Sequence, residues 1–141
     1  MKYISNTKTK KINRWIIQPR WVLVTCSGTI GRTAVSTIKQ DGWAASQHIL
    51  RIMPEENTTH PGFLAAFLST PYGQHQLKAK IYGGVVDELT AEDTEVLLIP
   101  DVPYSEQCRI GEPVVQVYEL RDEANFLEDE AIAELEAVIS G

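Results

Sequence analysis

The chain has 141 residues, of which 43% are hydrophobic, so its length suits one domain with at most one appended element. No apolar run approaches the ~20 residues that a membrane-spanning helix requires, and no apolar stretch follows the basic N-terminus as in a signal peptide. Cys26 and Cys108 are far apart and neither has a cysteine neighbour, which excludes the usual metal-binding spacing and leads us to expect a reducing, cytoplasmic setting.

The net charge of −6 argues against a nucleic-acid partner, but its distribution along the chain argues for one. Residues 1–51 hold nine Lys and Arg against a single acidic residue, a balance of +8, whereas residues 52–141 carry −14. This asymmetry predicts a basic face for a polyanion and an acidic part with a separate task. The alternative is that the N-terminal cations form only a solvated arm.

Residues 12–53 predict a helical turn followed by three strands. The turn covers residues 12–17 and ends before Pro19, because the residue before a proline resists the helical conformation. The strands cover residues 21–24, 33–38 and 46–53. Between the first two, Gly28 and Gly31 predict a tight turn that exposes backbone N–H groups, with Arg32 leaving it toward the same place.

Residues 54–100 predict short helices and two further strands. A helix opens at Pro61 and has one apolar face through Leu68, and a second helix covers residues 72–82 before a pair of glycines. A short strand is expected at residues 85–86, a single turn capped by Thr90 follows it, and residues 96–99 read as a buried strand.

The C-terminal part predicts a long helix that needs a partner. Residues 101–104 read as a linker, Ser105 as the cap of a short helix, and Gly111 with Pro113 as a break or kink. No helix breaker follows from residue 114 to 139, a stretch of about 38 Å at ~1.5 Å per residue. A narrow apolar stripe at coiled-coil spacing marks it, formed by Val114, Val117, Leu120, Ala124, Leu127, Ala131, Leu135 and Val138. The alternative is that this helix packs back along its own domain.

We therefore expect an α+β fold: a compact mixed-sheet domain with short helices, followed by a long C-terminal helix suited to a coiled coil. The expected division is a recognition domain at residues 1–100, then a linker and assembly helix at residues 101–141.

No catalytic set emerges from the sequence. The three histidines lack partners at ligand spacing and are expected to serve as core or cap residues, and Ser27 lacks the Gly-x-Ser-x-Gly frame of a nucleophile elbow. Neither a phosphate-binding loop nor a dinucleotide fingerprint is present. Asp87 and Glu88 could form a metal pair, but the exposed end of a strand explains them better. Recognition is left as the function that the hydroxyl, amide and cationic side chains around the glycine turn suit best.

Five segments, in this order, resemble the target recognition domain of specificity (S) subunits from type I restriction-modification systems. They are residues 22–32, residues 45–52, residues 63–68 with 72–74, residues 83–86 with Leu89, and residues 98–100; the acidic tail resembles the helical region that follows such a domain. The resemblance covers roughly residues 12–139.

The resemblance implies a non-catalytic subunit that reads one part of a split double-stranded DNA target with each recognition domain. It also implies that helices form an antiparallel coiled coil, which spaces two such domains and docks methyltransferase (M) subunits, with restriction (R) subunits as further partners and no cofactor of its own. A complete S subunit has two recognition domains, and this chain has room for one. It is therefore expected to be a fragment, a half-subunit that forms a homodimer through its helix, or a recognition domain of a fused restriction-methylation enzyme.

Two residue sets carry these expectations. Base reading is assigned to Thr29, Arg32 and Gln47, and phosphate binding to Lys8, Lys10, Lys11, Arg14 and Lys39. Helix assembly is assigned to Val117, Leu120, Ala124, Leu127, Ala131, Leu135 and Val138. The glycine turn could instead be shared scaffold. Two other kinds of protein are open: an interaction adaptor that acts through the helix without reading DNA, and a small enzyme built around Asp87 and Glu88.

Overall fold

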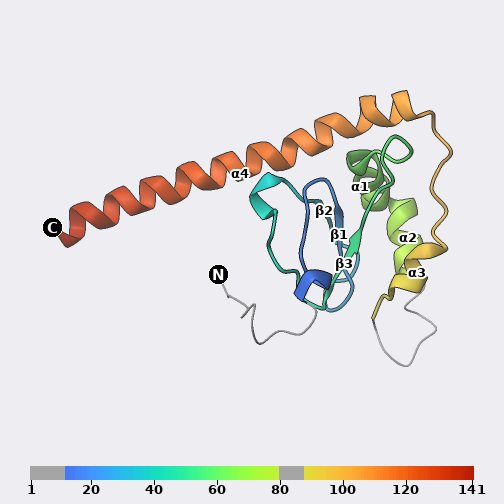
Figure 1. Cartoon of the computed structure of the whole chain (residues 1–141), viewed down its shortest axis with the longest axis horizontal. Coiled ribbons are helices and arrows are strands. Elements are labelled where there is room, and N and C mark those ends of the chain that lie inside the picture. Colours follow the sequence, from blue (N-terminus) through green and yellow to red (C-terminus); the bar gives the residue numbers. More distant parts are fainter. Residues whose placement is uncertain (1–11, 80–87) are drawn as a thin grey trace.

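The computed structural model describes residues 12–79 and 88–141, which form a small α+β body and one long helix (Figure 1). In chain order the elements are η1 (Ile12–Arg14), β1 (Val22–Thr25), β2 (Thr33–Val35), η2 (Ile38–Gln40), β3 (Ile49–Ile52), α1 (Pro61–Ser69), α2 (Pro71–Ala79), α3 (Ala91–Glu95) and α4 (Tyr104–Ser140). The expected α+β class is confirmed, as is a long C-terminal helix.

The three strands form one antiparallel sheet in the order β2-β1-β3. Val22 and Val24 of the central strand are fully buried and face α1, where Leu64 and Leu68 meet them in the same core. Residues between them in the strand point to the other face, because side chains alternate along a strand. All pairings among the described strands are antiparallel, so the mixed character expected of the sheet is not seen in them.

Local signals placed the short helices well. Pro61 opens α1 as expected, and Thr90 caps α3 in a reciprocal capping box with Asp93. The second helix begins at Pro71, close to its expected start. The strand expected at residues 85–86 lies outside the described residues.

The buried strand expected at residues 96–99 is wrong. This segment has no strand pairing, and the side chains of Val96 and Leu98 are 56% and 79% exposed. The side-chain amide of Gln76 satisfies the backbone of Leu98 instead, accepting from its N–H at 2.8 Å and donating to its carbonyl at 3.1 Å. An apolar run alone does not distinguish a strand from an extended segment whose backbone finds a side-chain partner.

The break expected at Gly111 and Pro113 is also wrong, because α4 runs without interruption from Tyr104 to Ser140. Gly111 is buried against Gly62 of α1, and a Cβ added to Gly62 would lie only 2.0 Å from the Gly111 carbonyl oxygen. The glycine therefore serves a close helix crossing rather than a helix end. Ser105 is not the cap, since Pro103 occupies that position without a side-chain hydrogen bond.

One face of the first half of α4 binds the body along a stripe that we call the docking stripe. It consists of Gln107, Gly111, Val115, Tyr118 and Asp122. The Tyr118 hydroxyl donates to the Thr33 carbonyl at 3.1 Å, and Asp122 accepts from the side chains of η2 and its cap. Beyond Asp122 every residue of α4 is exposed, and Figure 1 shows this half projecting away from the body to the C-terminus. Within the described ranges, no helix is long and apolar enough to cross a membrane.

Candidate nucleic-acid interface

The turn between β1 and β2, residues 26–32, is a structured glycine loop. Gly28 and Gly31 have φ angles of 68° and 86°, in the region that favours glycine. The Thr25 hydroxyl donates to the Thr29 carbonyl and accepts from the Arg32 backbone N–H at 3.0 Å. These bonds close the loop on itself, while the side chains of Thr29 and Arg32 are exposed.

A side chain of α2 also holds the glycine loop in place through hydrogen bonds. The Gln74 amide donates to the carbonyls of Gly31 and Leu68, both at 2.8 Å. Gly31 is buried, and a Cβ at this position would lie 2.9 Å from the Gln74 side-chain oxygen. The two glycines thus shape the loop as scaffold and leave its outer side chains to face a ligand.

A second turn, at residues 46–48, lies against the glycine loop. The Cys26 N–H donates to the His48 carbonyl at 2.9 Å, and Ser27 Oγ lies 2.6 Å from His48 Nδ1, within hydrogen-bonding distance. Gln47 and His48 are exposed. Gln47 therefore stands beside the glycine loop, although about fifteen positions of sequence separate them.

The three residues assigned to base reading lie at one end of the sheet. Thr29 and Arg32 belong to the glycine loop between β1 and β2, and Gln47 precedes β3, whose Ile49 pairs with Thr25 at the end of β1. Ser27 was among the hydroxyl side chains that sequence reasoning grouped around the glycine turn, whereas His48 was missed as a member of this group. Its signal was its place in the turn that precedes a predicted strand. We call this end, formed by Ser27, Thr29, Arg32, Gln47 and His48, the loop end.

The cations assigned to phosphates are not all at the loop end. Lys39 lies on η2, which follows the opposite end of β2, where Val35 pairs with Val22. Arg14 is exposed on η1, and its carbonyl accepts from Arg51. Lys8, Lys10 and Lys11 lie outside the described residues.

Charge at the loop end is mixed rather than uniformly basic. The exposed Glu88 precedes Leu89, whose N–H donates to the Cys26 carbonyl at 2.9 Å. Burial, followed by the charge of Glu88, raises the pKa of the Cys26 thiol, which keeps it neutral and unsuited to nucleophilic chemistry. An exposed carboxylate close to Cys26, next to the glycine loop, adds an acceptor to the donor groups of this end, and an acceptor can pair with the amino group of cytosine.

Histidines and acidic residues are the candidates for metal binding in the described part of the chain. No cluster of three or more His, Cys, Asp or Glu side chains there could hold a metal ion, and Asp87 lies outside it. Of the histidines, only His60 is buried, as the N-cap residue of α1, where its ring bonds Glu112 at 3.0 Å. The expectation of a core or cap role fails for His48 and His75, which are both exposed.

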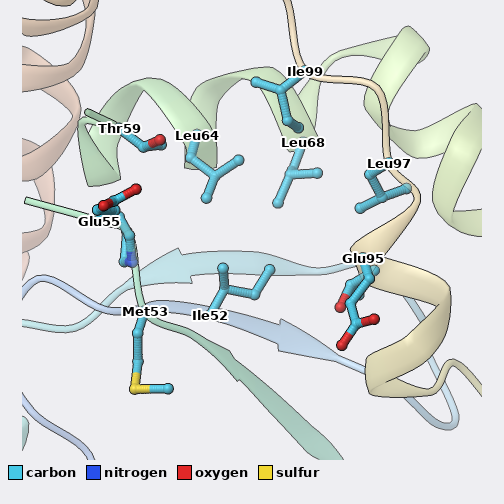
Figure 2. Close-up of a pocket in the computed structure, with 11 residues that line it drawn as sticks. Ile52, Met53, Glu55, Thr59, Leu64, Leu68, Glu95, Leu97 and Ile99 are labelled. Atoms are coloured by element: carbon cyan, nitrogen blue, oxygen red, sulfur yellow. The ribbon is translucent and has the colours of Figure 1, made fainter.

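A pocket of about 290 Å³ opens between α1, β3 and the segment at residues 94–99 (Figure 2). Ile52, Leu64, Leu68 and Leu97 line its apolar interior, and Figure 2 shows Glu95 at the α3 edge of the pocket, away from Leu64 and Leu68.

The residues assigned to helix assembly form a continuous exposed seam on α4. Every member from Val117 to Val138 is exposed, with Leu127 at 58% and Leu135 at 59%. At about 100° per residue, the seam lies about 165° around the helix from the docking stripe. The two stripes lie on different faces of α4. The alternative that the helix packs back along its own domain is therefore confirmed for its first half, through the docking stripe, while the seam is exposed.

Comparisons with known proteins agree with this architecture. The family model of the type I restriction modification DNA specificity domain matches residues 2–136. The HsdS subunit from Thermoanaerobacter tengcongensis superposes with a TM-score of 0.63 at 24% identity, over 97% of this chain and 36% of that one. A second solved chain, described under complex assembly and conformational transition of the type I R-M system, gives 0.59 at 27% identity, over 82% and 30%. The chain thus spans about a third of each solved chain, and no curated protein matches it.

Proposed function

Since the chain belongs to the family of type I restriction modification DNA specificity domains, we propose that it reads one part of a split double-stranded DNA target through its loop end. In this proposal the chain is not itself an enzyme. It directs methyltransferase and endonuclease subunits to the target from the cytoplasm, and the assembled complex performs the chemistry.

The observation that carries the proposal is that exposed polar side chains gather at the loop end, on turns that hydrogen bonds fix in place. Arg32 and Gln47 come from different turns, and backbone and side-chain bonds fix both turns to the end of the sheet. Arginine pairs with guanine and glutamine with adenine through two hydrogen bonds each, which requires side chains presented at a fixed angle. Because the glycine loop is already closed by its own hydrogen bonds, little conformational entropy is lost when its side chains bind DNA.

The division of labour between the two halves remains part of the proposal. The body at residues 1–100 would contact DNA, and residues 101–141 would join it to partners through the seam of α4. Two occupants of the seam fit the family resemblance: a second copy of this chain, and a helix of different sequence. In the adaptor alternative, residues 101–141 still bind a partner through the seam, but residues 1–100 do not read DNA.

A selection from a random duplex DNA library, carried out at low salt on the full chain, tests the proposal. An enriched short motif supports it, and binding should weaken as salt rises, because phosphate contacts release counterions. Gln47→Ala should relax the motif at one position, at a cost of about 1–3 kcal/mol in discrimination. Arg109→Ala, an exposed cation on α4 paired with Glu106, is the matched control and should leave the motif unchanged.

The adaptor alternative makes the opposite forecast. A chain that binds only through α4 would enrich no motif at any salt concentration, and Gln47→Ala would change nothing. That result, obtained with a chain shown to be folded, would reject DNA reading by this domain alone.

A further inference from the structure

The partner of the exposed seam on α4 can be specified by its charge. A row of four exposed glutamates borders the seam on one side: Glu119, Glu123, Glu130 and Glu134. At about 100° per residue these four lie within about 60° of one another around the helix, so they form one acidic edge, the glutamate row. The charged residues on the opposite border are Arg121 and Glu128.

The whole projecting half of α4 lacks cations. From Asp122 to Gly141 it has seven acidic residues and no Lys, Arg or His. Glu119 with Glu123, and Glu130 with Glu134, stand four residues apart, where like charges repel along a helix. No basic residue lies in the last turn, where the helix dipole favours one. Among the described residues, the ion pairs that involve α4 lie at or before Glu112. Lys39 of the body shares a pocket with Glu128 and Asp129, on a side of α4 away from the glutamate row.

A second copy of this chain would meet the row with its own row. In an antiparallel pair of identical helices, the two-fold axis is perpendicular to the plane that contains both helices, so each edge faces its own copy. Four glutamates would then lie opposite four glutamates, and juxtaposed like charges oppose association. A parallel pair would set the row against a border with a single arginine, Arg121, which is itself stacked at 5.3 Å over the Tyr118 ring.

We propose that the seam of α4 binds a basic amphipathic helix, whose apolar stripe fills the seam and whose Lys or Arg residues face the glutamate row, and not a second copy of this chain. This proposal rests on the proposed function, because it names the partner that the assembly half would take. Residues flanking an apolar seam set partner choice in coiled coils, so the row acts both to attract a basic helix and to reject an acidic one.

The seam is free to accept such a helix along its whole length. It faces about 165° away from the docking stripe, so a partner helix would not collide with the sheet. The partner would also supply the cations that the C-terminal turns of α4 lack.

The test compares two synthetic helical peptides that share one leucine stripe, flanked by lysines in the first and by glutamates in the second. Each is titrated into the full chain, with binding followed by fluorescence anisotropy. We expect the lysine peptide to bind at least about tenfold more tightly than the glutamate peptide. This ratio of affinities should shrink at high salt, because the glutamate row is exposed and salt screens its charge. A chain variant with the row neutralised should lose most of this ratio, namely Glu119→Gln, Glu123→Gln, Glu130→Gln and Glu134→Gln together.

A matched variant removes four carboxylates from the body instead and should keep the full ratio, namely Glu55→Gln, Glu56→Gln, Glu92→Gln and Glu95→Gln together. Equal binding of both peptides, or binding of neither, would overturn the proposal. So would a stable homodimer of the unmodified chain that the lysine peptide fails to dissociate in sedimentation experiments. DNA selection on the same variants separates the two proposals, because a failure to read DNA leaves the peptide ratio untouched.

Discussion

Replacing Gly111 by alanine tests whether a close helix crossing, rather than helix propensity, explains the glycine in α4. A Cβ at this position would lie 2.1 Å from His60 Nδ1 and 2.5 Å from the Phe63 backbone nitrogen. Real Cβ atoms do not approach so closely, and neither the buried ring nor the backbone can yield without moving α1. The crossing would therefore have to open.

The expected magnitude is the difference between two opposing effects. Overpacking a close contact costs about 1–3 kcal/mol, or more when backbone must move, whereas alanine gains about 1 kcal/mol over glycine in a helix interior. Because both obstacles at Gly111 are rigid, we expect the upper part of the range and a net loss of about 2 kcal/mol. This corresponds to a fall of roughly 8 °C in Tm for a chain of this size.

Urea unfolding of the full chain measures the effect, with Gln116→Ala, an exposed change on the same helix, as the control. Gly62→Ala should cost a similar amount, because its Cβ would lie 2.0 Å from the Gly111 carbonyl. The double variant should cost less than the sum, since one separation of the helices relieves both clashes. An unchanged or raised free energy of unfolding in Gly111→Ala would refute the close-crossing explanation.

Two further predictions concern the glycine loop and the buried histidine. Gln74→Ala removes the side-chain donor that bonds the Gly31 carbonyl of the glycine loop. The affinity for DNA, measured by titration well below Tm, should fall about fivefold, which is the equivalent of one hydrogen bond. An unchanged affinity would mean that α2 does not hold the loop in its binding conformation. The hydrogen bond from His60, and then the charge of Arg20, lower the pKa of Glu112 from its ordinary value of 4.5. A carboxyl with a lowered folded pKa stabilises the chain above its unfolded pKa, and this contribution is lost as pH falls through the folded value. Glu112→Gln should therefore reduce the loss of stability below pH 4.5 in urea unfolding at several pH values, and an identical acid limb in both proteins would contradict this.

The fold was predictable where one local signal decided the outcome. The short apolar run at residues 21–24 located β1, and the cap residue Thr90 located α3. The α+β class follows from such signals because each is settled within a few residues of chain. Turn glycines likewise located the loop that carries Thr29 and Arg32.

The errors arose where contacts distant in sequence decided the outcome. Gly111 was interpreted as a helix breaker because the sequence does not show Gly62 approaching it from another helix. The apolar run that ends at Ile99 was interpreted as a strand because the sequence does not show that Gln76 satisfies its backbone. In both cases the local preference was genuine, and a tertiary contact outweighed it.

The candidate site was predictable in composition but not in grouping. Arg32 and Gln47 could be named from their residue types beside turns, while Lys39, of equally suitable type, lies at the other end of β2. Strand register decides this, since a turn at one end of an antiparallel pair is a strand's length away from a turn at the other. Register depends on pairing across the sheet, which residue type alone does not report.

The two stripes of α4 link the loop end to whatever the seam binds. The docking stripe fixes the first half of α4 to the body at two places, through the Gly62–Gly111 crossing at one end and Asp122 at the other. The seam continues the same rigid helix for several turns beyond Asp122. A partner on the seam is therefore held at a set distance and angle from Arg32 and Gln47 without contacting them. In the proposed function, this geometry would let a bound partner position the domain on its part of the DNA target while the loop end alone reads the bases.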